Sequence, residues 1–433
     1  MKKEEMMKRK AIVAILVIFL CSVFAVNALA QATDDQEILY LLGSRASEVA
    51  MKELPFDKDD PNILVMTSAS YAIIDGHNTG RCIDGVADAS GCTVGKGNLL
   101  LIHRSREKPL WFAFFSKDTK ECVYLEVNNA VLGKSVDDFK ALADGEVFTK
   151  IVKENIGVDK LLNEPEAWDE KMRANVFGGG AKPFNNEFTM ITMANVWAKG
   201  APPELLRANQ FHNHICPGSA SGYLFVKYID KNLPLEKPSQ RYQIIAIKPW
   251  CKDDIMQWIL EATIGNKNYI AKDLTPEQMK QLPEDAKDVA NVVIRWDSAT
   301  GTGKGIVVAF DWDKAFQMCG DVSRKDLKAF DTHRWWWMRL KMNLWMLDYM
   351  DSPETLIHTV KEFDVDSPAE LNKLKSAGVN PLVELGIMSE PGTTSTPVST
   401  STEKTPSIPG LGVVAAIAIA GVVVYAARRR KRG

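Results

Sequence analysis

Two histidines and two cysteines in the second half of the chain could do chemistry. Imidazole and thiolate groups both bind zinc well, and three protein ligands leave one position for water or substrate. A metal held in this way polarises a carbonyl group or lowers the pKa of a bound water to about 7. We therefore predict a divalent metal, zinc, at His212, His214, Cys216 and Cys251.

The spacing of these residues indicates how they meet. His212, His214 and Cys216 alternate with other residues, so an extended backbone would place all three side chains on one face. Pro217 favours the first turn of a helix, where the helix dipole favours a thiolate at Cys216. The acidic segment after Cys251 is typical of a second helix start. Two polar side chains of that helix are expected to support the ligands: Asp254 and Gln257.

The sulfur atoms also allow other interpretations. Cysteines outside the cell tend to pair, so Cys216 and Cys251 could form a structural or exchange-active disulfide. A structural cell-envelope protein with an inactive site is a further alternative. With six cysteines beyond the first 30 residues, 15 pairings exist, and the sequence does not choose among them. They are Cys82, Cys92, Cys122, Cys216, Cys251 and Cys319.

The beginning of the chain is typical of an exported protein. Basic residues within positions 1–10 precede an apolar run over 11–26 and a small-x-small step at Ala28–Ala30. This order predicts a secretory signal peptide over residues 1–30.

The end of the chain predicts attachment to a membrane. Residues 389–408 are rich in Ser, Thr and Pro and are expected to form an extended stalk. Residues 409–433 contain an apolar segment with a basic end, which predicts a transmembrane anchor whose basic end stays in the cytoplasm. We expect a cell-surface protein that its C-terminus anchors to the cytoplasmic membrane.

The start of this anchor, Pro409-Gly410-Leu411-Gly412, resembles the PGF-CTERM tail of archaeal surface proteins, with Leu411 at the position of that family's phenylalanine. The resemblance implies processing by an archaeosortase and replacement of the tail by a lipid. Membrane attachment is expected with or without this processing.

The composition and an internal repeat indicate two α+β domains. The 433 residues carry a net charge of −2, which excludes the basic field expected of a nucleic-acid-binding protein. Residues 81–98 have an ungapped counterpart in residues 251–268. Each unit has the pattern of a helix, a strand, a helix and a hairpin, which predicts a mixed β-sheet flanked by helices. The expected domains are residues 31–165 and 170–350, followed by a helical extension over 351–388.

Two motifs of the second unit resemble the FmdE family, which takes its name from formylmethanofuran dehydrogenase. The first is Phe211-His212-Asn213-His214-Ile215-Cys216-Pro217-Gly218, where the family usually has glycine in place of Asn213. The second comprises Cys251, Asp254, Gln257, Thr263, Gly265 and Asn268. The resemblance covers roughly residues 205–316. It implies a thioredoxin-like α+β core, a homodimer and a divalent metal, zinc, at the active site.

The first unit resembles a degenerate copy of the second. It has no His-x-His-x-Cys segment, and Arg81 stands where the family has cysteine. We expect a structural partner domain without a second site. The family name implies part of a cytoplasmic enzyme, which an exported chain does not fit, so the substrate, and whether the protein is an enzyme, stay open.

Two further segments have structural interpretations. Gly301–Gly305 resembles a phosphate loop but lacks the spacing of a Walker motif, and we expect a hairpin turn. The aromatic residues Trp335–Trp337 lie in a predicted helix over 332–350, which we expect to be buried between domains or subunits.

Overall fold

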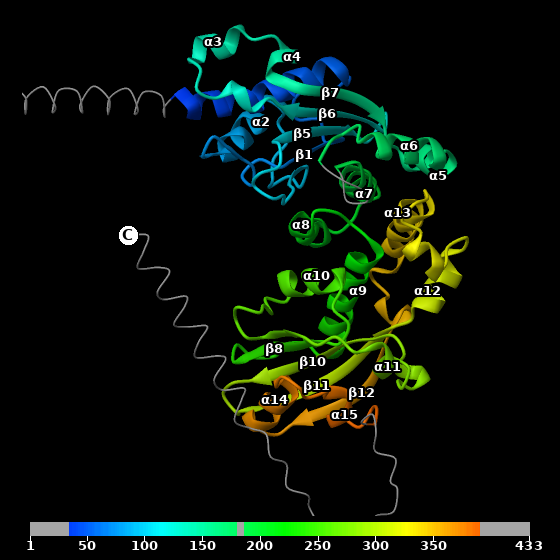
Figure 1. Cartoon of the computed structure of the whole chain (residues 1–433). Coiled ribbons are helices and arrows are strands. Elements are labelled where there is room, and N and C mark those ends of the chain that lie inside the picture. Colours follow the sequence, from blue (N-terminus) through cyan, green and yellow to red (C-terminus); the bar gives the residue numbers. More distant parts are fainter. Residues whose placement is uncertain (1–33, 180–185, 390–433) are drawn as a thin grey trace, which may run out of the picture. The chain divides into compact units, whose positions relative to one another are not determined.

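The computed structural model of the protein describes residues 34–179 and 186–389 (Figure 1). The predicted signal peptide, stalk and membrane anchor lie outside these residues. Within the described ranges, no helix has the length and apolar character needed to cross a membrane.

The first repeat contains a five-stranded mixed sheet in the order β4-β1-β5-β6-β7. β1 and β4 are parallel, whereas the other neighbours are antiparallel. A helix over residues 34–53 precedes the sheet in the chain, and α2 (Cys82–Ser90) lies between β1 and β4. The strands are β1 (Ile63–Thr67), β4 (Leu99–Leu101), β5 (Trp111–Ser116), β6 (Glu121–Val127) and β7 (Phe148–Asn155), beside a small hairpin of β2 (Ile73–Ile74) and β3 (His77–Asn78).

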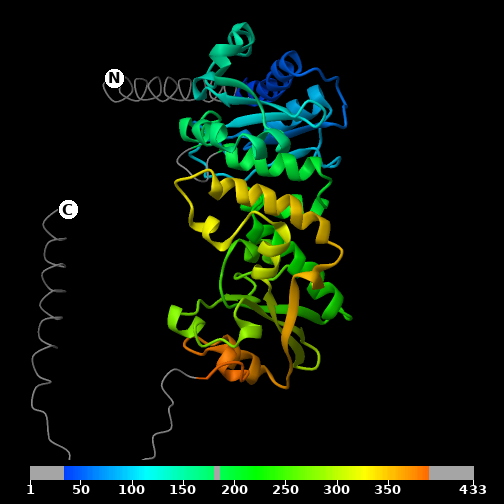
Figure 2. The same cartoon turned by 90° about the vertical axis from the view of Figure 1, so that its right-hand side faces the viewer.

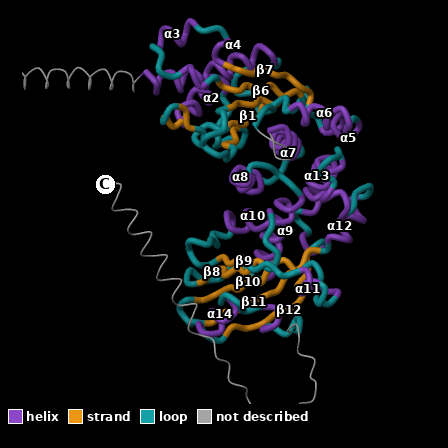
Figure 3. The backbone as a smooth tube through the Cα atoms, in the orientation of Figure 1, coloured by secondary structure: helices purple, strands orange, loops and turns teal. Residues whose placement is uncertain are grey.

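The second repeat contains a sheet of the same kind in the order β12-β11-β10-β8-β9 (Figure 3). β8 and β9 are parallel, as β1 and β4 are in the first sheet, and the remaining pairs are antiparallel. The strands are β8 (Gln240–Ala246), β9 (Tyr269–Ala271), β10 (Val289–Asp297), β11 (Thr302–Phe310) and β12 (Ile357–Val365). The prediction of two α+β units, each with a mixed sheet and helices, is confirmed, as are both predicted hairpins. Of the turn expected at Gly301–Gly305, Gly301 lies in the turn and the other residues begin β11.

The segment 351–388 is not a helical extension, as expected, because β12 lies within it. β12 pairs antiparallel with β11 and forms the edge of the second sheet. Only its end residues Ile357 and Val365 are buried, and the strand shifts register opposite Val307 and Val308. An irregular, half-exposed edge strand lacks the regular alternation by which a strand is recognised in a sequence. Helices α14 (Pro368–Lys375) and α15 (Pro381–Glu384) follow it, so the expectation holds for part of the segment.

The remaining helices connect the two sheets or cover them. They are α3 (Val136–Ala141), α4 (Asp144–Val147), α5 (Val158–Asn163), α6 (Pro165–Ala174), α7 (Asn186–Ala198), α8 (Pro203–His212), α9 (Pro217–Asn232), α10 (Cys251–Ile259), α11 (Pro276–Met279), α12 (Trp312–Cys319), α13 (Arg334–Met346), α14 (Pro368–Lys375) and α15 (Pro381–Glu384).

One apolar core extends through both repeats. It includes Met66 and Trp111 of the first sheet, Phe188 of α7, Phe225 of α9 and Trp335 of α13. α7 is buried on nearly all sides and packs against α13 (Figures 1 and 2). A helix without a polar face is stable only when it is surrounded by other elements. The tryptophan-rich helix α13, which packs against α7, is buried as predicted.

Both repeats use a glycine where two helices cross. A Cβ atom at Gly43 would overlap the carbonyl oxygen of Cys82 on α2, and one at Gly222 of α9 would overlap that of Lys252 on α10. Only glycine permits so close an approach of two backbones. The crossing of α9 and α10 positions the candidate site described below.

Glu187, in the first turn of α7, is completely buried. Its Oε1 atom accepts a hydrogen bond from the backbone N–H of Phe177 at 2.7 Å, while Oε2 has no partner among the described residues. Burial raises the pKa of this carboxyl to about 7.

This buried acid should make stability depend on pH. The unfolded chain releases the Glu187 proton at about pH 4.3, whereas the folded chain keeps it up to about pH 7. Between these values the folded state binds more protons, so the free energy of unfolding falls as pH rises. Glu187→Gln should therefore stabilise the protein at pH 8 by up to about 3 kcal/mol, with little effect at pH 4. Urea unfolding at both pH values measures this, and the exposed Glu277→Gln variant is the control. An equal effect of Glu187→Gln at both pH values would contradict the prediction.

Candidate metal centre

The His-x-His-x-Cys segment connects two helices and is not an extended strand. α8 ends at His212, Asn213 has a left-handed backbone with φ 62°, and α9 begins after Cys216. The expected reason for convergence, alternation along an extended backbone, is therefore wrong, because a tight turn brings the side chains together. Asparagine tolerates the left-handed conformation better than most residues, which explains how it can stand where the related motif has glycine.

Cys216 and Cys251 both lie at helix starts, as predicted. Cys216 is the N-cap of α9, and its Sγ accepts a hydrogen bond from the backbone N–H of Ser219 at 3.4 Å. Cys251 is the first residue of α10. The exposed N–H groups and the dipole of a helix start stabilise negative charge. Two such starts therefore favour thiolates at this place.

Gly218 provides the space in which the two cysteines meet. A Cβ atom at this position would lie 3.0 Å from the Cβ of Cys251 and 3.2 Å from the ring of Trp250. Any larger residue would push α10 away from the start of α9. The glycine of the sequence motif therefore has a packing role.

Three of the four predicted ligands form a compact group. The candidate ligand atoms of His212, Cys216 and Cys251 all lie within 4.8 Å of one another. The Nδ1 atom of His212 lies 2.7 Å from Oδ2 of Asp254, and its Nε2 atom is buried without a hydrogen-bond partner among the described residues. A carboxylate on one ring nitrogen and a free second nitrogen are typical of a metal-binding histidine. The donor set therefore fits a divalent metal that prefers nitrogen and sulfur.

His214 lies beside this group without being part of it. Its ring centroid is 4.5 Å from that of His212 and 5.2 Å from that of Phe188. Its Nδ1 atom lies 3.0 Å from Oδ1 of Asn213. Of the two residues expected to support the ligands, Asp254 contacts His212, and Gln257 lies one turn further along α10.

The charges of the group are coupled. Burial opposes a charge on Cys216, but interactions with Cys251, His212 and His214 lower the pKa of its thiol well below the usual value. Burial also opposes a charge on His212, yet Asp254 and Cys216 raise the pKa of its ring to about 9. The hydrogen bond to Cys216 raises the pKa of the Cys251 thiol. These shifts favour negative charge at Cys216, and a metal, which binds deprotonated ligands, would compete with protons for the group.

A buried polar network fixes the start of α10. Asp253 accepts hydrogen bonds from the backbone N–H of Trp250 at 2.6 Å and from Nδ2 of Asn291 at 3.1 Å, and its carboxylate pairs with Nζ of Lys252 at 2.7 Å. The hydroxyl of Tyr269 donates to the same carboxylate. Removing one member of such a buried pair leaves an uncompensated charge, so this network holds Cys251 in place.

Two further anchors hold the loop that carries the ligands. The backbone N–H of Ile215 donates to Oγ1 of Thr192 at 3.2 Å, and its carbonyl accepts from Nδ2 of Asn343 at 2.7 Å. Sequence reasoning missed Thr192 on α7 and Asn343 on α13. The available signal was a polar residue flanked by apolar ones, because a buried polar group needs a specific partner.

The first repeat supports the site of the second. The backbone N–H of Leu101 donates to Oε1 of Gln210 at 2.7 Å, and that of His103 donates to the carbonyl of Gln210 at 2.9 Å. The rings of His103 and Phe211 stack with centroids 5.8 Å apart. These contacts hold the last turn of α8, which ends at His212.

The first repeat has an ion pair where the second has its site. Arg81 is the N-cap of α2 and pairs with Asp84, and these residues correspond to Cys251 and Asp254. The described residues contain no other group of His, Cys, Asp and Glu side chains that could hold a metal.

The other residues shared by the repeats have structural roles. Thr93 and Asn98 form a turn in which the backbone N–H of Thr93 donates to Oδ1 of Asn98 at 3.0 Å. The hydroxyl oxygens of Thr93 and Thr263 accept hydrogen bonds from the same turn in each repeat, at 3.1 and 3.3 Å. Every cysteine of the described residues has a free thiol, and those outside the site are buried: Cys82, Cys92, Cys122 and Cys319.

Comparison with known families also finds two repeats in the chain. The sequence profile described as "FmdE, Molybdenum formylmethanofuran dehydrogenase operon" matches residues 39–173 and again residues 211–355. These two matches cover more than half of the chain. The chain belongs to the FmdE family. The FmdE repeat that begins at residue 211 includes all three residues of the group, and the other includes Arg81 and Asp84. A search of curated proteins finds no match.

The contact between Asp254 and His212 can be tested against its counterpart. Asp254→Asn should weaken zinc binding about 10–100-fold, because the carboxylate orients the ring and increases its basicity. The control is Asp84→Asn, the corresponding change in the first repeat, which should leave zinc affinity unchanged. Competition with a chromophoric chelator measures both affinities. Equal affinities of the two variants would exclude a supporting role for Asp254.

Proposed function

We propose that this FmdE-family protein binds a divalent metal, zinc, through His212, Cys216 and Cys251, in a catalytic or metal-handling role. The observation that carries the proposal is the convergence of two sulfurs and a free imidazole nitrogen at two helix starts. Nitrogen and sulfur donors together favour zinc over magnesium or calcium.

The charge balance of the group supports this proposal. Two thiolates neutralise a divalent cation, so the centre can be buried without a large desolvation cost. Three protein ligands leave one coordination position for water or substrate, which distinguishes catalytic zinc sites from closed structural ones. His214, whose ring lies 4.5 Å from that of His212, could act on a molecule in that position. When bound, zinc would supply Lewis acidity.

Single substitutions test the ligand set. His212→Ala, Cys216→Ser and Cys251→Ser should each weaken zinc binding by more than the about 10–100-fold that loss of a supporting group causes. His214→Ala should keep most of the metal. Elemental analysis after anaerobic purification measures metal content, with Cys319→Ser and His358→Ala as matched controls. Full metal content in the His212→Ala and Cys216→Ser variants would exclude this site.

A thiol–disulfide function is the second candidate, because the sulfurs of Cys216 and Cys251 lie within 4.8 Å of each other and the thiol of Cys216 has a lowered pKa. A low-pKa thiolate beside a second thiol is typical of exchange-active cysteines. Mass mapping without and with reductant distinguishes the two functions. A reversible Cys216–Cys251 disulfide in metal-free protein supports redox chemistry, whereas thiols protected by zinc support the metal function.

We further propose that the protein is exported and held at the cell surface by residues 409–433. The support comes from the sequence: a signal-like start, a Ser/Thr/Pro-rich stalk and an apolar segment with a basic end.

Truncation tests this location. Removal of residues 409–433 should release the protein from the membrane fraction, because the apolar segment would supply the attachment. Deleting only residues 389–408 is the control and should leave the protein membrane-bound. Fractionation after carbonate washing, together with protease digestion of intact cells, measures the outcome. Full-length protein in the soluble fraction would refute the anchor.

A further inference from the structure

A cavity of about 240 Å³ lies beside the start of α10, outside the candidate metal group. Aromatic side chains form a continuous wall of this cavity. The ring centroids of Trp312 lie 5.5 Å from Trp250 and 4.4 Å from Phe310, and Phe310 lies 6.1 Å from Phe225. Trp250 is 40% exposed and Trp312 is half-buried, whereas Phe225 and Phe310 are almost completely buried, so the two tryptophans supply the apolar surface that a ligand could reach. Such a wall suits the flat face of a ring.

Two of the three cations that line the cavity are paired with carboxylates. Arg324 pairs with Asp288 at 2.5 Å and with Asp313 at 2.7 Å, and the buried ammonium of Lys252 is paired with Asp253 at 2.7 Å. Lys248 is exposed, and no acidic residue of the described ranges forms an ion pair with it. The cavity therefore combines an apolar wall with a cation that has no protein counter-ion in the part of the chain that the structure describes.

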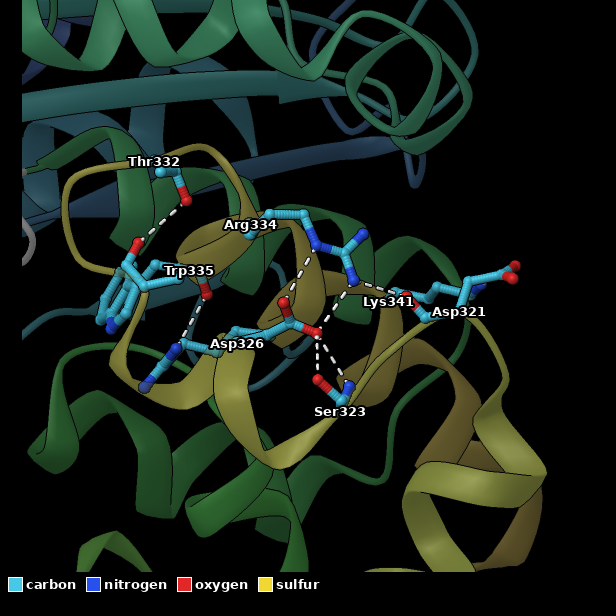
Figure 4. Close-up of polar contacts among 9 residues, drawn as sticks. Asp321, Ser323, Asp326, Thr332, Arg334, Trp335 and Lys341 are labelled. Atoms are coloured by element: carbon cyan, nitrogen blue, oxygen red, sulfur yellow. Dashed lines mark hydrogen bonds and ion pairs between the residues drawn. The ribbon is translucent and has the colours of Figure 1, made fainter.

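The wall opposite α10 is held in shape by its own polar network. The segment Arg324–Lys328 contributes Arg324 and Leu327 to the cavity. Asp326 accepts a hydrogen bond from the backbone N–H of Ser323 at 2.8 Å and pairs with Arg334 at 2.9 Å (Figure 4). Asp326 is 8% exposed, so its carboxylate is largely removed from water, whereas the Arg334 side chain is 33% exposed. A wall fixed in this way makes the cavity pre-formed, which lowers the cost of binding.

The aromatic wall is specific to the second repeat. Residues 81–98 align with residues 251–268 without a gap. The residue that precedes the aligned segment is Gly80 in the first repeat and Trp250 in the second. The second repeat therefore has both the candidate ligand Cys251 and the adjacent Trp250, and the first repeat has neither a cysteine nor an aromatic residue at these positions. This distribution links the cavity to the chemistry of the second repeat.

We propose that this cavity binds an organic anion with a flat aromatic body, with the ring against Trp250 and Trp312 and the anionic group at Lys248. A cavity of about 150 Å³ holds benzene, so this one admits a two-ring system. The proposal goes beyond the metal function and does not depend on it.

Calorimetry with three probes tests this proposal on the full-length protein. Naphthalene-1-sulfonate carries both features, naphthalene-1-sulfonamide keeps the rings without the charge, and methanesulfonate keeps the charge without the rings. The sulfonate should bind at one saturable site, at least about 10-fold more tightly than either other probe. Zinc-loaded and chelated protein should bind it equally, which separates this result from the test of the metal site.

Two variants locate the site. Lys248→Gln should remove the preference for sulfonate over sulfonamide, and Trp312→Ala should weaken the binding of both about 10-fold or more. The exposed Lys280→Gln variant is the control and should bind like the wild type. Absence of saturable binding, or a sulfonate preference that survives Lys248→Gln, would overturn the proposal. Since Lys248 is exposed, this variant decides the question even if Trp312→Ala does not fold.

Discussion

The close packing of α9 against α10 is the contact on which the site depends. Glycines at positions 218 and 222 allow the two helices to approach until Cys216 and Cys251 are neighbours. Because each cysteine lies at a helix start, both sulfurs receive the stabilisation that a helix N-terminus gives to negative charge. The remaining features orient groups around this contact. Asp254 holds the ring of His212, and Thr192 and Asn343 hold the loop between the helices.

The two repeats show how one framework serves two purposes. Both have a parallel strand pair beside an antiparallel hairpin. Both also have a glycine at the helix crossing and a turn that a threonine hydroxyl caps. Among the described residues, only the second has a group of metal-binding side chains, while the first has the Arg81–Asp84 ion pair in its place. The first repeat contributes instead by holding Gln210 at the end of α8. The first repeat therefore has a supporting role, whereas the candidate metal site belongs to the second repeat.

Three consecutive residues join the metal group to the cavity. Cys251 belongs to the group, whereas Trp250 and Lys252 line the cavity. Successive side chains at a helix start diverge by about 100°, so one short segment can serve two sites. Asp253, the next residue, fixes the whole segment through its buried network. A molecule in the cavity would contact the residues on both sides of a candidate ligand.

Much of the fold and of the site could be predicted from local patterns in the sequence. Hairpins at 117–120 and 298–301, helix starts after Cys216 and at Cys251, and the nitrogen and sulfur chemistry of the site all depend on neighbouring residues. The tertiary structure decided the rest. The left-handed backbone of Asn213 directs His212 toward the sulfurs and places His214 beside them, and β12 becomes a strand because β11 offers it an edge. The contacts of Thr192, Asn343 and Gln210 join residues far apart in the chain, and such pairings leave no periodic signal in a sequence because they depend on how whole elements pack.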